Sequence, residues 1–189
     1  MASKTIYTTA CVWGSSSFNS STDLKVGKSS SATYKGRITF AVVPANWVIK
    51  KITLKLNRID SYAAHTLIFG GSASSGFSAT LAFSVSKSIS TGTGSKTIDL
   101  TSYAKKIQGF GGTWYIHVRH SSGSNSYTEF SGDERSTSLK PQLVIQYEQA
   151  TVYVNVAGVW KQCLVYYCNN GTWVQCIPYY NSGGTWKQV

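Results

Sequence analysis

Apolar and polar residues alternate along much of the first 148 positions, and this period of two is typical of β-strands with one buried face. In the segment 114–120, Trp114, Ile116 and Val118 alternate with more polar neighbours. In 37–43, the same rule places Val42 on the buried face with Ile38 and Phe40. The segments that show the pattern are 37–43, 51–57, 66–69, 81–85, 96–100, 114–120 and 142–147. So many short strands predict an all-β fold, an antiparallel β-sandwich of the jelly-roll type.

The stretches between these strands are predicted as turns and loops, with one exception. Residues 1–35 are rich in Ser, Thr and Gly and are interpreted as short strands and loops that lead into the sandwich, and 70–76 as a flexible glycine loop. The exception is a helical turn that Thr101 could cap, which runs through Ile107 and stops at Gly109. Hydrophobic residues make up 42% of the 189 positions, enough to bury a core of this kind.

The last 39 residues repeat with a period of 13, and three columns stay in register. Each unit is predicted as strand, tight glycine turn and strand, which divides the chain into a sandwich at 1–148 and three tandem β-hairpins at 149–189. A lone hairpin is marginally stable, so the hairpins are expected to stack on each other or on a partner. The repeated tyrosine and tryptophan columns are the candidate assembly interface: Tyr153, Trp160, Tyr166, Trp173, Tyr179 and Trp186.

The net charge of +11 raises the possibility of an anionic partner, such as nucleic acid, teichoic acid or a negatively charged cell surface. The lysines are dispersed, however, and do not form the cluster that marks a nucleic-acid site, so no nucleic-acid role is predicted. The start of the chain lacks a signal-peptide pattern, and no run approaches the ~20 apolar residues of a membrane span. Synthesis in a cytosol without membrane insertion is therefore expected.

Four segments of the sandwich region resemble, in order and spacing, the bacterial and phage domain family named for its DNRLRE motif. They are 18–27, 37–40, 97–104, and 131–136 followed by 139–147, and the last of them contains Asp133, Glu134 and Arg135. The resemblance implies a jelly-roll module allied to carbohydrate-binding modules. It also implies that Asp133 to Arg135 form a motif before the last strand, where an ion-paired structural corner is the simplest role.

The repeats resemble the Tyr/Trp repeats that end many structural proteins of phages and prophages of Gram-positive bacteria. This resemblance implies a virion component such as a tail fibre, baseplate, head fibre or capsid decoration protein. Its expected partners are other virion proteins or further copies of itself as a homo-oligomer. Such a protein is made in the host cytoplasm and released by lysis.

The sequence contains few residues that could act in catalysis. The seven acids are scattered, and only Glu129 could pair with Asp133 or Glu134 across a loop, where a solvated turn is the favoured interpretation. Neither a Gly-x-Ser-x-Gly elbow nor a phosphate-binding glycine loop is present in the sequence. We therefore expect a protein that is not an enzyme, with no catalytic residues.

Metal and cofactor sites are not expected either. His117 and His120 should lie on opposite faces of one strand, and His65 stands alone. The spacing of the late cysteines, Cys163, Cys168 and Cys176, does not match a zinc site, and ordinary packing is favoured over metal or disulfide. Whether these three are free thiols is left open.

Aromatic residues supply the binding chemistry, with 12 Tyr and 6 Trp in the chain. An exposed ring can stack on the C–H face of a sugar while nearby polar groups bind its hydroxyls. The candidate ligand-binding residues are the four rings predicted in loops, with one arginine: Trp13, Trp47, Tyr62, Tyr127 and Arg135. The alternative for each ring is burial in the core. Two functions follow: a virion structural protein or, as the alternative, a carbohydrate-binding module that recognises a cell-surface polysaccharide.

Overall fold

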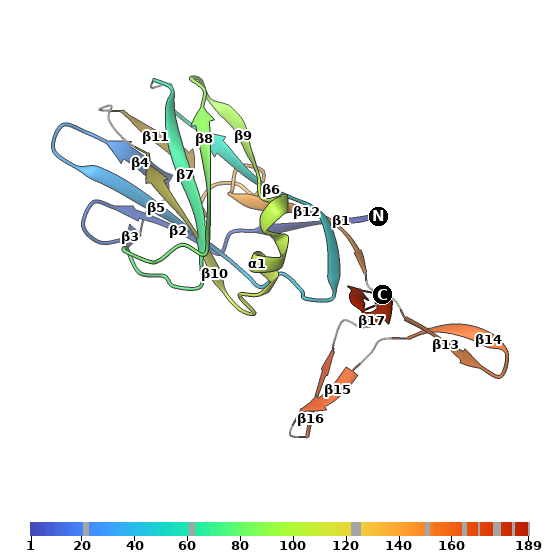
Figure 1. Ribbon diagram of the computed structural model, residues 1–189. Helices are drawn as coiled ribbons and strands as arrows, with labels where there is room; N and C mark the ends of the chain where they lie inside the picture. The colour runs from blue at the N-terminus through green and yellow to red at the C-terminus, as the bar shows by residue number, and fades with distance from the viewer. Residues whose placement is uncertain are drawn as a thin grey trace.

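The computed structural model describes residues 1–20, 23–60, 63–121, 126–149, 152–163, 166–169, 171–175, 179–182 and 184–188. Its first part is an antiparallel β-sandwich (Figure 1). Sheet A consists of β9 (Gly94–Asp99), β6 (Trp47–Arg58), β12 (Gln142–Gln149) and β1 (Ala2–Tyr7), together with β11 (Tyr127–Ser131) and β4 (Asp23–Lys28). Sheet B consists of β3 (Asn19–Ser20), β2 (Ala10–Gly14), β5 (Thr33–Phe40), β10 (Trp114–His120), β7 (His65–Ser72) and β8 (Phe83–Ile89).

Within sheet A, strand β6 pairs with β12 along one edge and with β9 along the other, and it meets β11 at Arg58. Strands β4 and β5 pair at two positions, Gly27 with Tyr34 and Lys28 with Thr33, and so link sheet A to sheet B. The all-β antiparallel sandwich predicted from the sequence is confirmed, whereas its jelly-roll connection order stays a prediction.

The core lies between the sheets and is filled by the apolar half of each alternating strand. Ile52, Leu54 and Leu56 of β6 are buried as predicted, and so are Trp114, Ile116 and Val118 of β10. Trp114 is fully buried between the rings of Phe40 and Phe110, and its indole N–H donates to the Ala41 carbonyl. That hydrogen bond satisfies the only polar atom of this large side chain, which makes its burial favourable.

Two expectations about strand limits are wrong. Val42 is 45% exposed, because β5 ends at Phe40 and the alternation stops there. Gly70 and Gly71 belong to β7 and are buried, not part of a flexible loop. A Cβ added at Gly70 would lie 2.3 Å from Leu81, and one at Gly71 would lie 2.1 Å from the ring of Phe83. These glycines therefore serve close packing, which a sequence cannot distinguish from flexibility.

The predicted helical turn is present as a 3-10 turn, η1 (Thr101–Tyr103), followed by α1 (Ala104–Gln108), and it ends before Gly109. Its capping is different from the prediction. The Asp99 carboxylate accepts the N–H of Thr101 at 2.8 Å, whereas the Thr101 hydroxyl accepts the N–H of Ile52 in β6 at 3.1 Å. Ile107 is buried in the core, so the turn closes one end of the sandwich.

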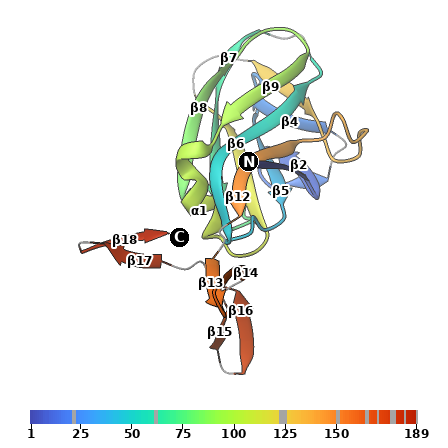
Figure 2. The same ribbon diagram turned by 90° about the vertical axis from the view of Figure 1, so that its right-hand side faces the viewer.

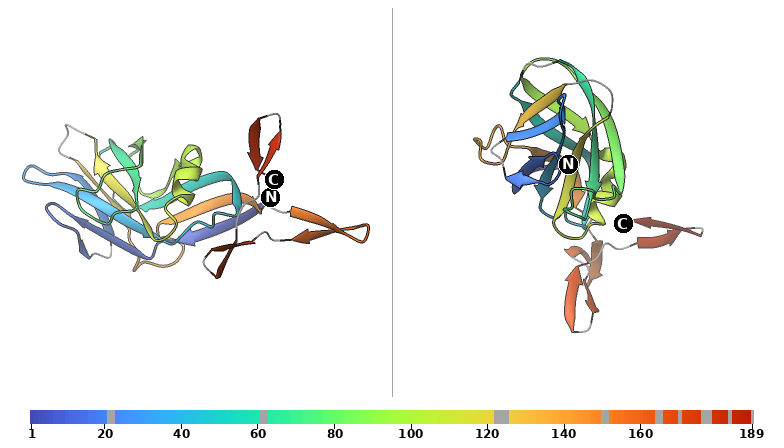
Figure 3. Two further views of the ribbon diagram at one scale, coloured as in Figure 1. Left: turned by 60° about the horizontal axis from the view of Figure 1, so that its bottom comes forward. Right: turned by 90° about the vertical axis from the view of Figure 1, so that its left-hand side faces the viewer.

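Beyond β12 the chain forms three hairpins: β13 (Val152–Val156) with β14 (Val159–Cys163), β15 (Tyr166–Asn169) with β16 (Thr172–Gln175), and β17 (Tyr179–Ser182) with β18 (Thr185–Gln188). Gly158, Gly171 and Gly184 have φ values of +82° to +83° at the turns. In the described part of the chain each hairpin is a separate two-stranded sheet (Figures 2 and 3). Whether the hairpins stack on one another or on a partner stays a prediction.

The predicted division of the chain at residue 148 stays a prediction, and β12 runs through Gln149. Among the described residues, no helix is long and apolar enough to cross a membrane.

Candidate functional site

Two of the predicted ligand-binding rings meet around one lysine on the outer face of sheet A. The Lys25 Nζ lies 4.0 Å from the ring centroid of Tyr127, 5.1 Å from that of Tyr34 and 5.7 Å from that of Trp13. The rings of Trp13 and Tyr34 contact each other edge to face, with centroids 5.3 Å apart. The Glu129 carboxylate lies 3.6 Å from the Lys25 Nζ. We call these five residues the Lys25 cluster.

Strand register explains why the cluster forms. Leu24 and Val26 point into the core, so Lys25 between them faces outward, and Glu129 of β11 lies directly opposite it. Gly27, two residues further along β4, is paired with Tyr127 on one side and with Tyr34 on the other. Its φ of +142° suits glycine.

Gly27 also lets the backbone of β11 come close. A Cβ at this position would lie 2.3 Å from the Cα of Tyr127 and 2.3 Å from the carbonyl oxygen of Ser126. The missing side chain therefore permits the approach that brings Tyr127 to Lys25. Substitution of Gly27 would displace the cluster as a whole.

The Lys25 cluster combines aromatic faces with a charged centre. The side chain of Lys25 is 22% exposed and that of Glu129 is 34% exposed, so both keep contact with solvent. A cation over aromatic faces is stabilised by the ring quadrupoles, which fixes the rings of three strands relative to one another. Half-buried rings beside an ammonium and a carboxylate offer the stacking surface and hydrogen-bond groups that a sugar ring requires.

Sequence reasoning found Trp13 and Tyr127 but assigned both to loops, and this assignment is wrong. Trp13 lies in β2 and Tyr127 lies in β11. Lys25 and Tyr34 were missed altogether. The signal for Lys25 was its position between two core residues, but nothing in the sequence indicated which rings would face it.

The remaining candidate ligand residues lie elsewhere. Trp47, predicted in a loop, is the first residue of β6 and stacks on Tyr147 with centroids 3.8 Å apart and an interplanar angle of 12°. It packs against the core, which is the alternative interpretation considered for each ring, and part of Trp13 does so as well. Tyr62 lies outside the described residues.

Arg135 forms the ion-paired corner that the resemblance implied. Its Nε and Nη2 donate to the two carboxylate oxygens of Asp23 at 2.8 and 2.5 Å. Asp133 accepts the backbone N–H of Cys11 at 2.7 Å, so this motif joins the last connection of the sandwich to β2 and β4. Arg135 is still 47% exposed and could contact a ligand at its outer edge.

The acids near this corner are held by separate partners. Glu129 is paired with Lys25, and its backbone N–H donates to the Asp60 carboxylate. Asp60 in turn forms a buried ion pair with Arg58 at 2.7 Å. A catalytic pair of Glu129 with Asp133 or Glu134 was considered from the sequence and not favoured, and in the structure Glu129 contacts Lys25.

His65 does not stand alone, in contrast to the prediction. Its ring centroid lies 5.5 Å from that of His120, and its Nε2 lies 3.2 Å from the Thr128 hydroxyl. Burial lowers the pKa of both histidines. Among the described residues, no three His, Cys, Asp or Glu side chains are grouped as metal ligands would be.

Two cysteines can be assigned. Cys11 is a buried free thiol whose pKa is raised to about 12 by burial, and Cys168 is a free thiol on the surface. The side chain of Cys163 and the whole of Cys176 lie outside the described residues, so their state stays open.

The candidate assembly residues are placed by backbone register. Trp160, Trp173 and Trp186 are paired with Asn155, Cys168 and Asn181, at equivalent positions of the three hairpins. Three large apolar side chains of the hairpins are exposed, Val156 by 46%, Val159 by 58% and Tyr166 by 46%. The polar Asn155, Thr172 and Thr185 are exposed as well. The side chains of Tyr153, Trp160, Trp173, Tyr179 and Trp186 lie outside what the structure describes.

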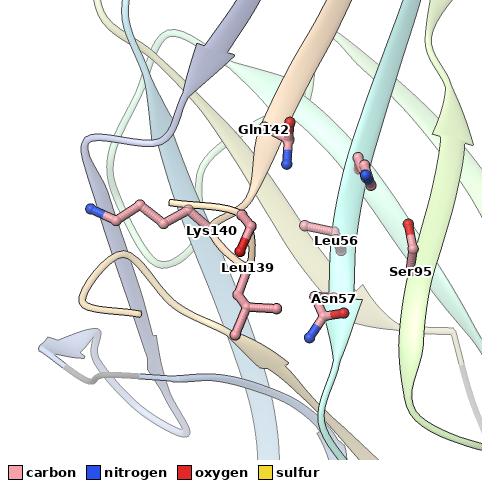
Figure 4. Close-up of a pocket in the computed structure, with 8 residues that line it drawn as sticks. Leu56, Asn57, Ser95, Leu139, Lys140 and Gln142 are labelled. Carbon is pink, nitrogen blue, oxygen red and sulfur yellow. The ribbon is translucent and has the colours of Figure 1, made fainter. Parts of the chain in front are cut away.

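A shallow pocket lies between β6, β9 and the segment before β12, and Figure 4 shows the residues that line it, with Leu139 and Lys140 on one side and Leu56 and Ser95 on the other. Its volume is about 80 Å³. Pockets that enclose a small organic ligand have volumes of roughly 300 Å³ or more, so this one is too small to be the principal site.

Neither a scan against protein-family models nor a search of curated proteins found a match for this chain. The function must therefore be argued from the geometry of the two surfaces, the Lys25 cluster and the hairpins.

Proposed function

We propose that this chain is a structural protein of a phage or prophage virion, a part of a tail fibre, baseplate, head fibre or capsid decoration. In this proposal the C-terminal hairpins assemble with further copies of the chain or with other virion proteins, and the sandwich is presented for surface attachment. The protein is made in the host cytoplasm and becomes part of the particle. Its role is binding and assembly, without catalysis.

One observation carries this proposal. Each hairpin pairs only within itself in the described part of the chain, and an isolated two-stranded hairpin is marginally stable in water. Three consecutive hairpins with a repeated Tyr and Trp pattern therefore need a surface to pack against. The exposed Val156, Val159 and Tyr166 are the kind of apolar side chains that such a contact would cover.

The test compares the mass of the full chain with that of residues 1–149 by sedimentation velocity. The full chain should self-associate or bind a virion protein encoded by a neighbouring gene, and the shortened chain should do neither. A Trp160→Ala, Trp173→Ala, Trp186→Ala triple variant should behave like the shortened chain, whereas Trp47→Phe in the sandwich serves as a control that keeps assembly. A full chain that stays monomeric and is absent from purified particles would contradict the proposal.

A second function, recognition of a cell-surface glycan, is favoured by the Lys25 cluster. Two rings chosen from the sequence for sugar stacking meet a third ring there, around one ion pair. A glycan array probed with the full chain should give binding that Trp13→Ala and Tyr127→Ala abolish and Trp47→Phe retains. Absence of glycan binding together with clear assembly would leave the structural role alone.

A further inference from the structure

The outer face of sheet B carries four basic side chains at adjacent positions. Lys35 and Arg37 lie on β5, and His117 and Arg119 lie on β10. Arg37 and His117 are directly opposite each other in the antiparallel register. Their strand neighbours Gly36, Ile38, Ile116 and Val118 are buried on the core side, so the four basic residues all face outward.

The connection between β7 and β8, residues 73–82, covers this face, and we call it the flap. In Figure 1 it is the green loop at the lower ends of β7 and β8. Three of its backbone carbonyl oxygens accept hydrogen bonds from the basic residues. Arg37 Nη1 donates to Ser75 at 2.5 Å, His117 Nε2 donates to Ser74 at 2.9 Å, and Arg119 Nη2 donates to Ala79 at 2.6 Å.

Aromatic rings close the sides of the same face. The Arg37 guanidinium lies 4.9 Å from the ring centroid of Phe18 and 5.2 Å from that of Tyr115. The Lys35 Nζ lies 4.3 Å from the ring centroid of Phe77, which belongs to the flap. Such rings exclude water, and they make every electrostatic interaction inside the face stronger than it would be in solvent.

Hydrogen-bonding capacity remains unused on this face. Arg37 Nε and Arg119 Nε are buried and have no hydrogen-bond partner among the described residues, and the same holds for His117 Nδ1 in a side chain that is 1% exposed. Buried N–H groups without an acceptor are unfavourable, and native proteins keep few of them. When His117 is protonated, its Nδ1 adds a third donor.

The charge on this face is also unbalanced. The flap carbonyls are neutral, and the ion pairs found among the described residues involve other arginines and lysines. Burial lowers the pKa of His117 and of Lys35, and nearby cations lower both further: Arg119, Arg37 and Lys35 act on His117, and Arg119 acts on Lys35. The face therefore has a positive potential that an anion would relieve.

We propose that this basic face is a binding site for a single carboxylate or phosphate group, such as the anionic group of an acidic polysaccharide. Arg37 and Arg119 are its principal donors, and Lys35 adds a charge at the rim. The flap carbonyl oxygens occupy the positions that the oxygens of the ligand take once the flap moves aside. Its four basic residues are distinct from the five of the Lys25 cluster, and the proposal depends neither on assembly nor on neutral-sugar binding.

The compactness of the cluster favours a single anionic group over a nucleic acid. Guanidinium groups bind carboxylate and phosphate through paired N–H groups, and two of them beside a lysine suffice for one such group. A nucleic-acid surface instead follows a backbone over many phosphates and gives a steep dependence on salt.

The test measures binding of two probes, glucuronate and inorganic phosphate, to the full chain by NMR titration at low ionic strength. Binding of glucuronate alone identifies a carboxylate site, binding of phosphate alone identifies a phosphate site, and either result supports the proposal. An Arg37→Gln, Arg119→Gln double variant should bind about tenfold more weakly or worse, since each lost charge-assisted hydrogen bond costs at least that factor. The matched control is Lys4→Gln, Lys51→Gln, which removes the same charge from exposed positions of sheet A.

Because Arg37 and Arg119 also hold the flap, two further measurements separate binding from folding. Arg37→Lys keeps the charge but loses the paired N–H groups, and it should weaken binding while the near-UV circular dichroism stays native. In the wild-type chain, a bound probe should increase proteolytic cleavage within the flap. Trp13→Ala should leave anion binding unchanged, which keeps this result independent of the glycan-binding proposal.

Three outcomes would overturn the inference. The first is a wild-type chain that binds neither probe, which would leave the basic residues with the role of holding the flap. The second is equal weakening by the control variant, which would show an effect of net charge alone. The third is tighter binding of a thymidine oligonucleotide with a salt dependence equivalent to several phosphates.

Discussion

The sandwich and the hairpins are built from the same kinds of residue, yet they reach stability in different ways. In the sandwich each strand shares its faces with several neighbours, and even a buried charge such as Arg58 has a carboxylate and a carbonyl beside it. In each hairpin two short strands meet only each other, and the turn is the main local constraint. The difference teaches that β-propensity favours the strand conformation, but the number of strands that share a face decides whether the resulting sheet is stable on its own.

The largest expected effect is on the stability of the sandwich, which should depend on its own buried contacts. Asp60→Ala removes the carboxylate that pairs with Arg58, whose side chain is fully buried, and so takes away a counter-charge inside the protein. Breaking a buried pair in this way costs about 3–5 kcal/mol of unfolding free energy. Urea denaturation monitored by tryptophan fluorescence measures it.

The control for Asp60 is an ion pair of the same chemistry on the surface. Glu148→Ala breaks the pair with Lys50, in which the two side chains are 52% and 40% exposed. An exposed pair contributes about 0–1 kcal/mol, so this variant should unfold near the wild-type midpoint. If the two variants lost the same free energy of unfolding, water would have access to the Arg58 side chain.

A smaller effect concerns pH. The pKa of His117 in the folded state is lowered from its ordinary value of 6.5 by burial and by Arg119, Arg37 and Lys35. The unfolded chain therefore binds the proton more readily, so the free energy of unfolding should be highest above pH 6.5 and should fall as the pH drops below it. Thermal unfolding between pH 7.5 and 5 measures this fall.

His117→Gln should reduce this acid destabilisation without removing it, since the pKa values of His65 and His120 are lowered as well. The pKa of Asp99 is also lowered in the folded state, but its carboxylate titrates near 3.8 or below and does not contribute in this range. A variant with an unchanged pH profile would show that His117 titrates as it does in the unfolded chain.

The smallest expected effect lies in the first hairpin. Ala157 has φ of +52°, and among the described residues it is the only one other than glycine with a positive φ. Asparagine tolerates this conformation better than alanine, and the second repeat has Asn170 at the equivalent position. Ala157→Asn should therefore stabilise the turn by a few tenths of a kcal/mol, roughly the size of a turn preference.

This gain is best measured by amide hydrogen exchange in β13 and β14. The exchange should slow in that hairpin, while the exchange of β6 and β10 in the sandwich should stay as it was. A change of the same size in both regions would mean that the hairpin and the sandwich unfold together, which would break the comparison.

The sequence predicted features that depend on neighbouring residues, but it did not predict contacts between segments far apart in the chain. Strand β10 begins at Trp114 and ends at His120 as predicted, because its alternation is strict and local. The candidate ligand-binding rings could be selected by residue type, but the sequence did not predict where they meet. Trp13, Tyr34 and Tyr127 come from three strands far apart in the chain, and they meet only because the register around Gly27 brings them to Lys25.

The basic face under the flap shows the same limit. Lys35, Arg37, His117 and Arg119 are ordinary outward positions in two separate segments, so no pattern in the sequence indicated a shared site. Their juxtaposition depends on the pairing of β5 with β10, and their cover depends on Gly70 and Gly71, which were interpreted as flexible. Long-range pairing and close backbone approach are the two features that a single sequence does not display.

The position of β12 has a mechanical consequence. This strand leads directly into the hairpins, and it is bonded along one edge to β6 and along the other to β1. If the hairpins anchor the protein and a load acts on the far end of the sandwich, the two ladders flanking β12 are strained in shear, so that many hydrogen bonds resist together. A force on β1 from the anchored end would instead unzip its ladder one pair at a time, starting where Ala2 faces Tyr147.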